Sequence, residues 1–274
     1  MTAFNSKSGG FFLTTVGRVQ TPTLSIVVQR EEQVRKFVPK NYWEVRAEFI
    51  AAAGIYEGRW INPEFKKDPS DPDARENRLW SEAAAKSIAA ACRNKKGVVR
   101  EESKPATQLA PQLFDLTSLQ REANARFGFS AKNTLGLAQA LYERHKVLTY
   151  PRTDARALPE DYIDTVHKTI EGLGDHSTDY KAFAQTILKG DGKKSWVKPN
   201  KRIFDNSKIS DHFAIIPTLE APKNLSEPEQ KLYDLVVRRF LAVFYPAAEY
   251  QVTTRITEVS GHHFKTEGRI LVEP

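Results

Sequence analysis

The chain has 274 residues, 40% hydrophobic and 27% charged, a composition typical of a soluble globular protein with one large domain or two modest ones. No apolar run approaches the roughly 20 residues that a membrane span needs, and the single cysteine, Cys92, excludes an internal disulfide and a thiolate-rich zinc site. The net charge of +7 permits a polyanionic partner without requiring one.

The first predicted helix follows a polar segment. Thr21 and Pro22 are typical of an N-cap and a first helical position, and the apolar stripe that follows ends before Pro39. Arg18 and Gln20 would share one face of an extended segment leading into this helix. An arginine and an amide beside a helix N-terminus form a ready anion site, and ordinary helix capping explains the same residues equally well.

Strand-like patterns flank a helical centre. Residues 42–61 alternate apolar and polar side chains, which predicts paired strands. Residues 62–78 are rich in Asp, Pro and Lys, which predicts a long surface loop. Ser81 is expected to cap an alanine-rich helix that ends at Gly97 and leads into a strand. Residues 248–259 alternate again, so the layout predicts a β-rich domain interrupted by helices.

The helical centre begins near residue 105. Thr117–Gln120 fits a capping box for a helix that ends near Gly128, and Ser130 opens a second helix. Two short helices followed by a strand-like segment are similar to a winged-helix arrangement.

Two more helices are predicted after this pair. The first begins at Pro159 and closes at Gly172 and Gly174. The second begins at a capping box of Ser226 and Glu229 and is long.

The segment Leu148–Asp154 concentrates reactive side chains. If it is extended, Tyr150, Arg152 and Asp154 lie on one face, and Pro151 biases the residue before it towards an extended backbone. A phenol beside a guanidinium suits attack on a phosphodiester. A buried edge strand with a surface ion pair explains the same pattern, so the stretch alone does not distinguish a catalytic segment from a structural one.

A basic tract covers residues 189–208. Its lysines and arginine are candidates for contacts to a nucleic-acid backbone, with Trp196 and Phe204 as stacking groups, and a solvated basic loop is the alternative. The candidates are Lys193, Lys194, Lys198, Lys201 and Arg202.

A histidine follows this tract at the start of an apolar run. His212 has Asp211 beside it, which could orient or charge the imidazole. A lone histidine in such a place is more often structural than catalytic.

Four stretches in this order resemble the type IA DNA topoisomerases, particularly the bacterial topoisomerase III branch. The resemblance spans almost the whole chain. The stretches are Gly17–Leu24, Leu116–Phe129 with its Gln120-Arg121-Glu122-Ala123-Asn124, Leu148–Asp154 and Asp211–Thr218.

The resemblance implies roles for individual residues. Tyr150 would be the nucleophile, forming a covalent bond to a 5′ phosphate of single-stranded DNA, and Arg152 would hold the scissile phosphate. Thr153 and Asp154 would support the site, and His212 would contact the DNA or assist the chemistry. The expected contacts to the DNA backbone also include Arg18, Gln20 and Thr21.

The family fold is a toroid, which implies an α+β fragment of a toroidal core. A discontinuous β-rich arch would carry an inserted helical, winged-helix-like domain that bears the tyrosine. The expected parts are a partial DNA-entry domain at 1–40, the arch at 41–105 and 217–274, and the helical domain at 106–216.

Cofactors and partners also follow from the resemblance. In the family, an N-terminal metal-binding (Toprim) domain binds Mg²⁺ and supplies a general acid, and nothing upstream of Thr15 matches it. The expectation is therefore a fragment that binds no metal itself and needs that domain as its partner. No ATP is expected, since the chain has no phosphate-binding glycine loop. Phe213 stands where relatives often have a second histidine.

The predicted parent protein is an isomerase that cleaves, passes and religates strands of single-stranded or underwound duplex DNA. The fragment alone is expected to be inactive in relaxation. A cytoplasmic, nucleoid-associated location is expected, with no membrane partner. The alternative is a non-catalytic winged-helix DNA-binding module, and a tyrosine recombinase is disfavoured because its dispersed arginines and histidines have no match.

Overall fold

The computed structural model describes residues 2–4, 13–15, 17–192 and 194–273. The chain divides into two units, and each is described by itself. Unit 1 comprises Met1–Glu101 and Thr254–Thr266, and unit 2 comprises Glu102–Thr253 and Glu267–Pro274. No helix of the described residues is long and apolar enough to span a membrane.

Unit 1 begins with a short antiparallel pair and a helix. Strands β1 (Thr2–Phe4) and β2 (Leu13–Thr15) pair, and α1 (Gln20–Arg35) follows. The predicted helix is confirmed, but the predicted cap is wrong. The backbone N–H of Thr21 donates to the carbonyl of Gly17 at 3.2 Å, so the first turn starts before Thr21, with Val19 at the N-cap.

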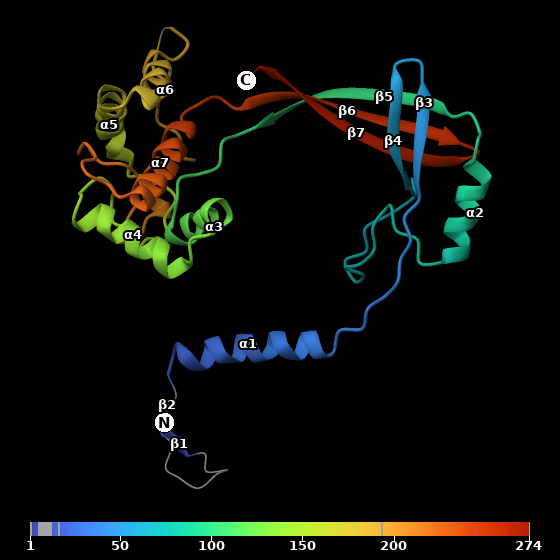
Figure 1. Cartoon of the computed structure of the whole chain (residues 1–274), viewed down its shortest axis with the longest axis horizontal. Helices are drawn as coiled ribbons and strands as arrows, with labels where there is room; N and C mark the ends of the chain where they lie inside the picture. The colour runs from blue at the N-terminus through green and yellow to red at the C-terminus, as the bar shows by residue number, and fades with distance from the viewer. Residues whose placement is uncertain (1, 5–12, 16, 193, 274) are drawn as a thin grey trace. The chain divides into compact units, whose positions relative to one another are not determined.

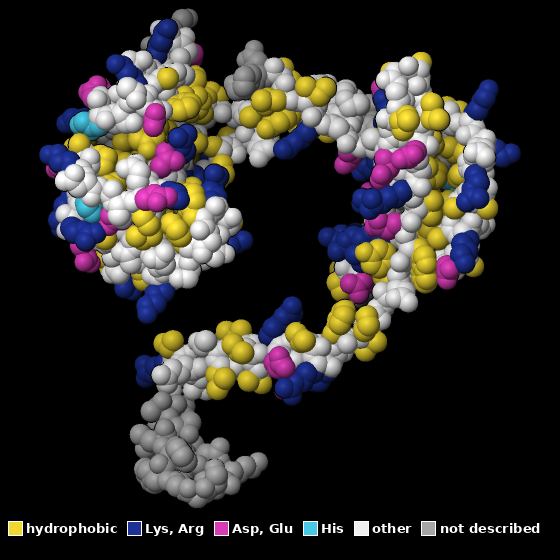
Figure 2. Space-filling view, in the orientation of Figure 1, with side chains coloured by type: hydrophobic (Ala, Val, Ile, Leu, Met, Phe, Trp, Pro, Cys, Tyr) yellow, Lys and Arg dark blue, Asp and Glu magenta, His cyan; other side chains and the backbone are white. Residues whose placement is uncertain are grey.

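No side chain of α1 is buried, and Figure 2 shows hydrophobic side chains exposed along it. Its apolar stripe therefore lacks a covering surface within the described residues. The exposed members of the stripe include Leu24, Val27, Val28 and Val34.

The rest of unit 1 is built on a hairpin and a helix. The predicted paired strands are confirmed as β3 (Arg46–Ala51) and β4 (Gly54–Ile61), which are antiparallel. Ser81 caps α2 (Glu82–Cys92) as predicted, although the helix ends well before Gly97. The core of this unit consists of Val45, Ala85, Ile88, Val259 and Phe264.

Three long strands complete a five-stranded sheet in the order β3-β4-β7-β6-β5 (Figure 1). They are β5 (Val98–Gln108), β6 (Ala248–Val259) and β7 (His262–Glu273). Each of the three contains a boundary between the two units. Sheet and helices together make the chain α+β, as predicted.

Unit 2 is helical (Figure 1), and its residues form the larger of the two hydrophobic cores. Its longer helices are α3 (Leu116–Phe127), α4 (Ala131–Glu143), α5 (Ile163–His176), α6 (Thr178–Lys189) and α7 (Glu227–Ala242). Two 3-10 turns are η1 (Glu160–Tyr162) and η2 (Asn206–Lys208).

Several predicted helix ends are confirmed and others are wrong. Ser130 caps α4 and a capping box of Ser226 and Glu229 starts α7, as predicted. Helix α3 ends at Gly128, whose φ of 71° is the left-handed conformation that glycine adopts without strain. The cap of α3 is Asp115 rather than Thr117, because the Asp115 carboxylate accepts from the backbone N–H of Ser118 at 2.8 Å.

Helix α7 corrects the predicted domain boundary. The helical domain was expected to end at residue 216, whereas unit 2 continues to Thr253. Residues of α7 such as Leu232, Val236 and Phe240 are fully buried in the same core as α3, α4 and α6. The apolar face of α7 therefore belongs to the helical unit and not to the sheet.

Candidate active site

The segment that carries Tyr150 lies antiparallel to residues 214–217. The backbone N–H of Thr149 donates to the carbonyl of Ile216 at 3.0 Å, and Leu148 pairs with Pro217. The Thr149 hydroxyl donates to the carbonyl of Ala214 at 3.0 Å and accepts from the N–H of Ile216 at 2.9 Å. These bonds fix the backbone immediately before Tyr150.

Thr153 joins the same two segments further along. Its hydroxyl donates to the carbonyl of His212 at 2.9 Å and accepts from the N–H of Ala155 at 3.1 Å. Its own carbonyl accepts from the N–H of Leu116, the first residue of α3, at 3.0 Å. Thr153 is buried, so the predicted supporting residue acts here as a backbone link between the tyrosine and histidine segments.

Side chains alternate along the tyrosine segment as an extended backbone requires. Pro151, Thr153 and Ala155 are buried, whereas Arg152 and Asp154 are exposed and Tyr150 is half-buried. The predicted shared face of these last three residues is therefore confirmed. No hydrogen bond or ion pair joins Arg152 or Asp154 to another described residue, which leaves the guanidinium available for an anion.

Two aromatic neighbours hold the ring of Tyr150. The His212 imidazole lies with its centroid 4.3 Å from the Tyr150 centroid at an angle of 44°. The Tyr142 ring meets Tyr150 edge to face at 5.4 Å and 78°, and the Lys146 ammonium lies 5.7 Å from the Tyr142 centroid. His212 itself is exposed, so the tyrosine and the histidine share an accessible surface.

The structure thus adds Tyr142 and Lys146, which were not predicted as site residues. Tyr142 lies near the end of α4, and its contact with Tyr150 depends on the turn after that helix. Lys146 lies in that turn with a φ of 60°, and its carbonyl accepts a hydrogen bond from the Thr218 hydroxyl at 2.6 Å. No local sequence signal marks either residue, because the positive φ of Lys146 is a feature of the folded turn.

Arg156 and Asp115 form an ion pair at 3.2 Å beside this segment. Burial raises the pKa of Asp115, but hydrogen bonds from Ser118 and the Arg156 guanidinium outweigh burial and lower the pKa overall. Asp115 is therefore held as a carboxylate that caps α3. Arg156 is two residues after Asp154 and is exposed, as Arg152 and Asp154 are.

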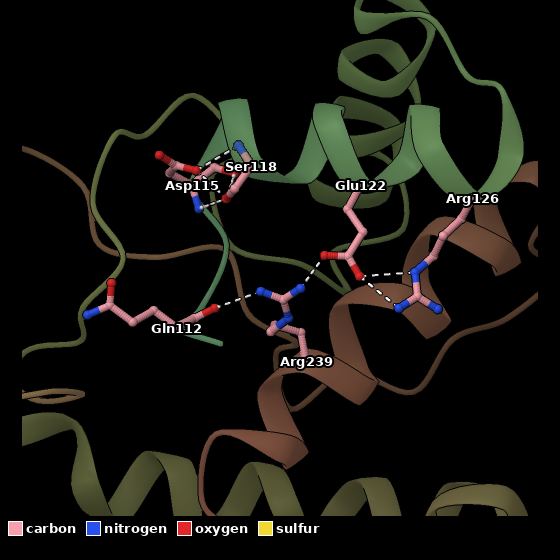
Figure 3. Close-up of polar contacts among 6 residues, drawn as sticks. All are labelled: Gln112, Asp115, Ser118, Glu122, Arg126 and Arg239. Atoms are coloured by element: carbon pink, nitrogen blue, oxygen red, sulfur yellow. Dashed lines mark hydrogen bonds and ion pairs between the residues drawn. The ribbon is translucent and has the colours of Figure 1, made fainter. Parts of the chain in front are cut away.

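Polar contacts link α3, and the residues just before it, to α7 (Figure 3). We call the contacts of Arg239 with Gln112 and Glu122 the brace. Arg239 of α7 donates to the carbonyl of Gln112 at 3.1 Å and pairs with Glu122, and its guanidinium lies 4.2 Å from the Phe114 centroid. Glu122 also pairs with Arg126 at 2.9 Å. Because Phe114 accepts a backbone hydrogen bond from Ile215 at 2.8 Å, the brace supports the segment after His212.

Two other residues of the Gln120–Asn124 motif make local structural contacts. The Gln120 amide donates to the carbonyl of Ala131 at 3.0 Å, and the Asn124 amide donates to the carbonyl of Phe129 at 3.0 Å. Both bonds close the turn between α3 and α4.

The predicted DNA contacts of the N-terminal region lie in unit 1, whereas Tyr150 lies in unit 2. Arg18, Gln20 and Thr21 are exposed at the start of α1. Their role in binding DNA stays a prediction.

The basic tract is only partly available for a ligand. Lys194 and Lys198 are exposed, whereas Lys201 pairs with Glu160 at 2.6 Å and Arg202 donates to the carbonyl of Ala110. Lys193 lies outside the described residues.

The two aromatic residues of this tract pack inwards. Phe204 is 2% exposed, so the expectation that it stacks on bases is wrong. Trp196 is half-buried and meets Tyr245 edge to face at 5.2 Å. Both rings support the helical core.

Magnesium was expected to be bound outside these residues. Within the part of the chain that the structure describes, no three His, Cys, Asp or Glu side chains come together to hold a metal ion. The expectation that Mg²⁺ is bound by another part of the protein stays a prediction.

Comparisons with known proteins agree on one family. The sequence model of a family described as DNA topoisomerase matches residues 1–274. A DNA topoisomerase 3 of Bacillus subtilis (strain 168) is 40% identical over 256 residues, covering 92% of this chain and 32% of that protein. A DNA topoisomerase 3 of Bacillus licheniformis is 41% identical over 256 residues, with the same coverage of 92% and 32%.

A solved structure is similar in fold. Full-length topoisomerase I from Thermotoga maritima matches 95% of this chain and 39% of its own, with a TM-score of 0.63 and 22% identity. The chain spans about a third of the length of the curated relatives, 32% in both cases above. Over that span it belongs to the DNA topoisomerase family and is similar to the type IA, topoisomerase III-like enzymes of bacteria.

Proposed function

We propose that this chain supplies the nucleophile of a type IA DNA topoisomerase, with Tyr150 cutting and rejoining a single DNA strand. The observation that carries the proposal is the half-buried Tyr150 ring between Tyr142 and His212, with the exposed Arg152 on the same face. Single-stranded DNA, including the strands of underwound duplex, is the proposed substrate.

In the proposed cleavage step, the Tyr150 oxygen attacks the phosphorus of a phosphodiester. A bond forms between the tyrosine oxygen and phosphorus, and the bond from phosphorus to the 3′ oxygen breaks. The phenol loses its proton and the departing 3′ oxygen gains one, so the products are a 5′-phosphotyrosine and a free 3′ hydroxyl. The reverse attack by that hydroxyl reseals the strand, and since one ester replaces another, no nucleotide is consumed.

Each neighbour of Tyr150 has a proposed part in this step. A tyrosine with a pKa of about 10 is a weak nucleophile at neutral pH, so nearby positive charge assists it. Arg152 has the planar fork of donors that fits two phosphate oxygens, and it would stabilise charge on phosphorus in the transition state. His212 would contact the DNA beside the scissile phosphate, while Asp154 and the buried Thr153 support the segment.

Covalent trapping tests the proposal. Single-stranded DNA labelled on the 3′ side of the cleavage site is incubated with the chain, with and without the metal-binding part of a related topoisomerase, and denatured. We expect a labelled protein band only when that part is present, and no relaxation of supercoiled DNA by the chain alone. Tyr150→Phe removes the nucleophile and should abolish the band. Thr117→Val, an exposed substitution on α3, is the matched control and should retain it.

A labelled band that persists with Tyr150→Phe would assign the nucleophile to another residue. Robust relaxation by the chain alone would show that the additional part is not needed.

A second candidate is a non-catalytic DNA-binding module. The consecutive helices α3 and α4, followed by the extended segment at Leu148, are the observation that favours it. A DNA-binding module should prefer duplex DNA and discriminate between sequences, whereas a topoisomerase should prefer single-stranded DNA. Competition between labelled single-stranded and duplex DNA separates the two.

A further inference from the structure

The outer edge of β3 is open. In the sheet order, β3 is the last strand and pairs only with β4 among the described residues. The N–H of Trp60 donates to the carbonyl of Val45 at 2.8 Å, which makes this a hydrogen-bonded pair of the antiparallel ladder. Because such pairs alternate with non-bonded ones, Arg46, Glu48 and Ile50 direct their backbone N–H and C=O groups away from β4.

A groove of about 770 Å³ runs along this strand, within unit 1. Val45 and the residues of β3 form one wall, and the end of α2 with the following turn forms another. Val45 and Phe264 give the groove an apolar lining. An open strand beside an apolar groove is the arrangement to which extended peptides add as a further strand.

The rim of the groove is positively charged. Arg93, Lys95 and Lys96 line it and are exposed, and none of them forms an ion pair with a described residue. Glu48 is the one carboxylate in the lining. The positive charge of these unpaired side chains therefore favours a negatively charged ligand in the groove.

The aromatic rings of the groove argue against single-stranded nucleic acid as that occupant. Phe49 stacks on Tyr56 at 5.2 Å and meets Phe264 edge to face at 5.5 Å. The guanidinium of Arg255 lies 4.2 Å from the Tyr56 centroid. Because the protein itself packs against these rings, they are not free for the base stacking on which single-strand binding depends.

We propose that the groove binds an extended, acidic segment of a partner protein, which adds to the β3 edge as a sixth strand of the sheet. Its backbone would pair with Arg46, Glu48 and Ile50. Alternate side chains would enter the apolar groove, and carboxylates would face the cationic rim. This inference does not depend on the proposed catalytic function.

Binding to the full chain is measured by fluorescence polarisation with a labelled peptide of alternating Asp and Val. A peptide of alternating Lys and Val and an oligo-dT strand serve as competitors. We expect saturable binding of the acidic peptide, displacement by neither competitor, and slower amide exchange at residues 46–50 in the complex. Binding should weaken with salt, because the rim charges are exposed.

Two pairs of variants identify the surface. Lys95→Glu with Lys96→Glu should weaken binding by about fivefold or more, whereas the same change at the exposed pair Lys66 and Lys67, outside the groove, should leave binding unchanged. Glu48→Pro removes one N–H from the open edge and no bond to β4, so it should abolish binding in a folded protein. Glu48→Gln keeps that N–H and should retain binding.

The proposal is overturned if the acidic peptide shows no saturable binding, or if Glu48→Pro binds it like the unchanged chain. It is also overturned if oligo-dT displaces the peptide and itself slows exchange at residues 46–50, because the groove would then be a nucleic-acid site. Circular dichroism of each variant confirms that a loss of binding is not a loss of fold.

Discussion

The hydroxyl of Thr153 donates a hydrogen bond to the backbone carbonyl of His212 at 2.9 Å. Thr153 lies three residues after Tyr150, so this bond ties the tyrosine segment directly to the histidine segment. Thr149, one residue before Tyr150, makes the equivalent bond to Ala214 at 3.0 Å. The two threonines thus hold the Tyr150 and His212 rings at their separation of 4.3 Å through the backbone.

Replacing Thr153 by valine keeps the shape of the side chain and removes both hydrogen bonds. The carbonyl of His212 and the N–H of Ala155 lose their partner beside a buried side chain, so we expect the free energy of unfolding to fall by about 1–3 kcal/mol. Urea denaturation measures the change. Thr117→Val is the control, because Thr117 is exposed, and should shift the midpoint little. Equal effects of the two substitutions would contradict the role given to Thr153.

Arg239 and Arg126 pair with the same carboxylate, Glu122, and differ in exposure (Figure 3). The side chain of Arg239 is 14% exposed and that of Arg126 is 60% exposed. Arg239→Leu would leave Glu122 and the Gln112 carbonyl without this partner, and we expect a loss of about 2–4 kcal/mol. Arg126→Leu should cost about 0–1 kcal/mol, as exposed pairs do.

Thermal or urea unfolding of the two variants measures this difference. If Arg126→Leu were as destabilising as Arg239→Leu, burial of Arg239 would not explain the contribution of its contacts to the free energy of unfolding. Arg239→Lys is a further control, since an ammonium retains the charge but not the planar fork that reaches Gln112 and Glu122 together.

Local patterns predicted the tyrosine segment well. The period of two along Pro151–Asp154 correctly gave the shared face of Tyr150 and Arg152, since one side of the segment packs on the core. Caps such as Ser130 were also predicted, because a side-chain hydrogen bond to the first helical turn depends on residues close in sequence.

Tertiary packing accounts for what the sequence did not predict. Gly174 was interpreted as a helix end, but α5 runs through it to His176. A Cβ at Gly174 would lie 3.1 Å from the Cβ of Ala184 on α6, so the position favours glycine for packing and not for ending a helix. The glycine permits close packing of α5 on α6, a helix that was missed altogether. The contact of Tyr142 with Tyr150, and the burial of Phe204, likewise depend on neighbours distant in the sequence.

Stability at low pH should depend on Glu229, which is 4% exposed. Burial raises its pKa, but hydrogen bonds from Ser226 and the Arg144 guanidinium outweigh this and lower the pKa from 4.5 to about 2. A carboxyl whose pKa is lower in the folded state stabilises the fold above its unfolded pKa. That contribution is lost as the pH falls from about 4.5 towards 2.

Glu229→Gln should therefore be clearly less stable than the unchanged chain at pH 6, and the difference should shrink as the pH is lowered below 4.5. Urea unfolding across this range measures it. Glu227→Gln is the control, because Glu227 is an exposed residue of the same first helical turn and its pair with Lys231 lies in solvent. A difference that stayed constant with pH would mean that the Glu229 charge does not stabilise the fold.

Helix α1 should exchange its amide hydrogens much faster than α7, although both have 16 residues. None of its side chains is buried, whereas α7 buries eight, including Leu232 and Phe240. A helix of this length without packing is marginal in water, because its stability comes mainly from burying an apolar face. Hydrogen exchange measured by mass spectrometry on the full chain tests this expectation. Slow exchange in α1 comparable to that in α7 would show that another surface covers Leu24, Val27 and Val28 in solution.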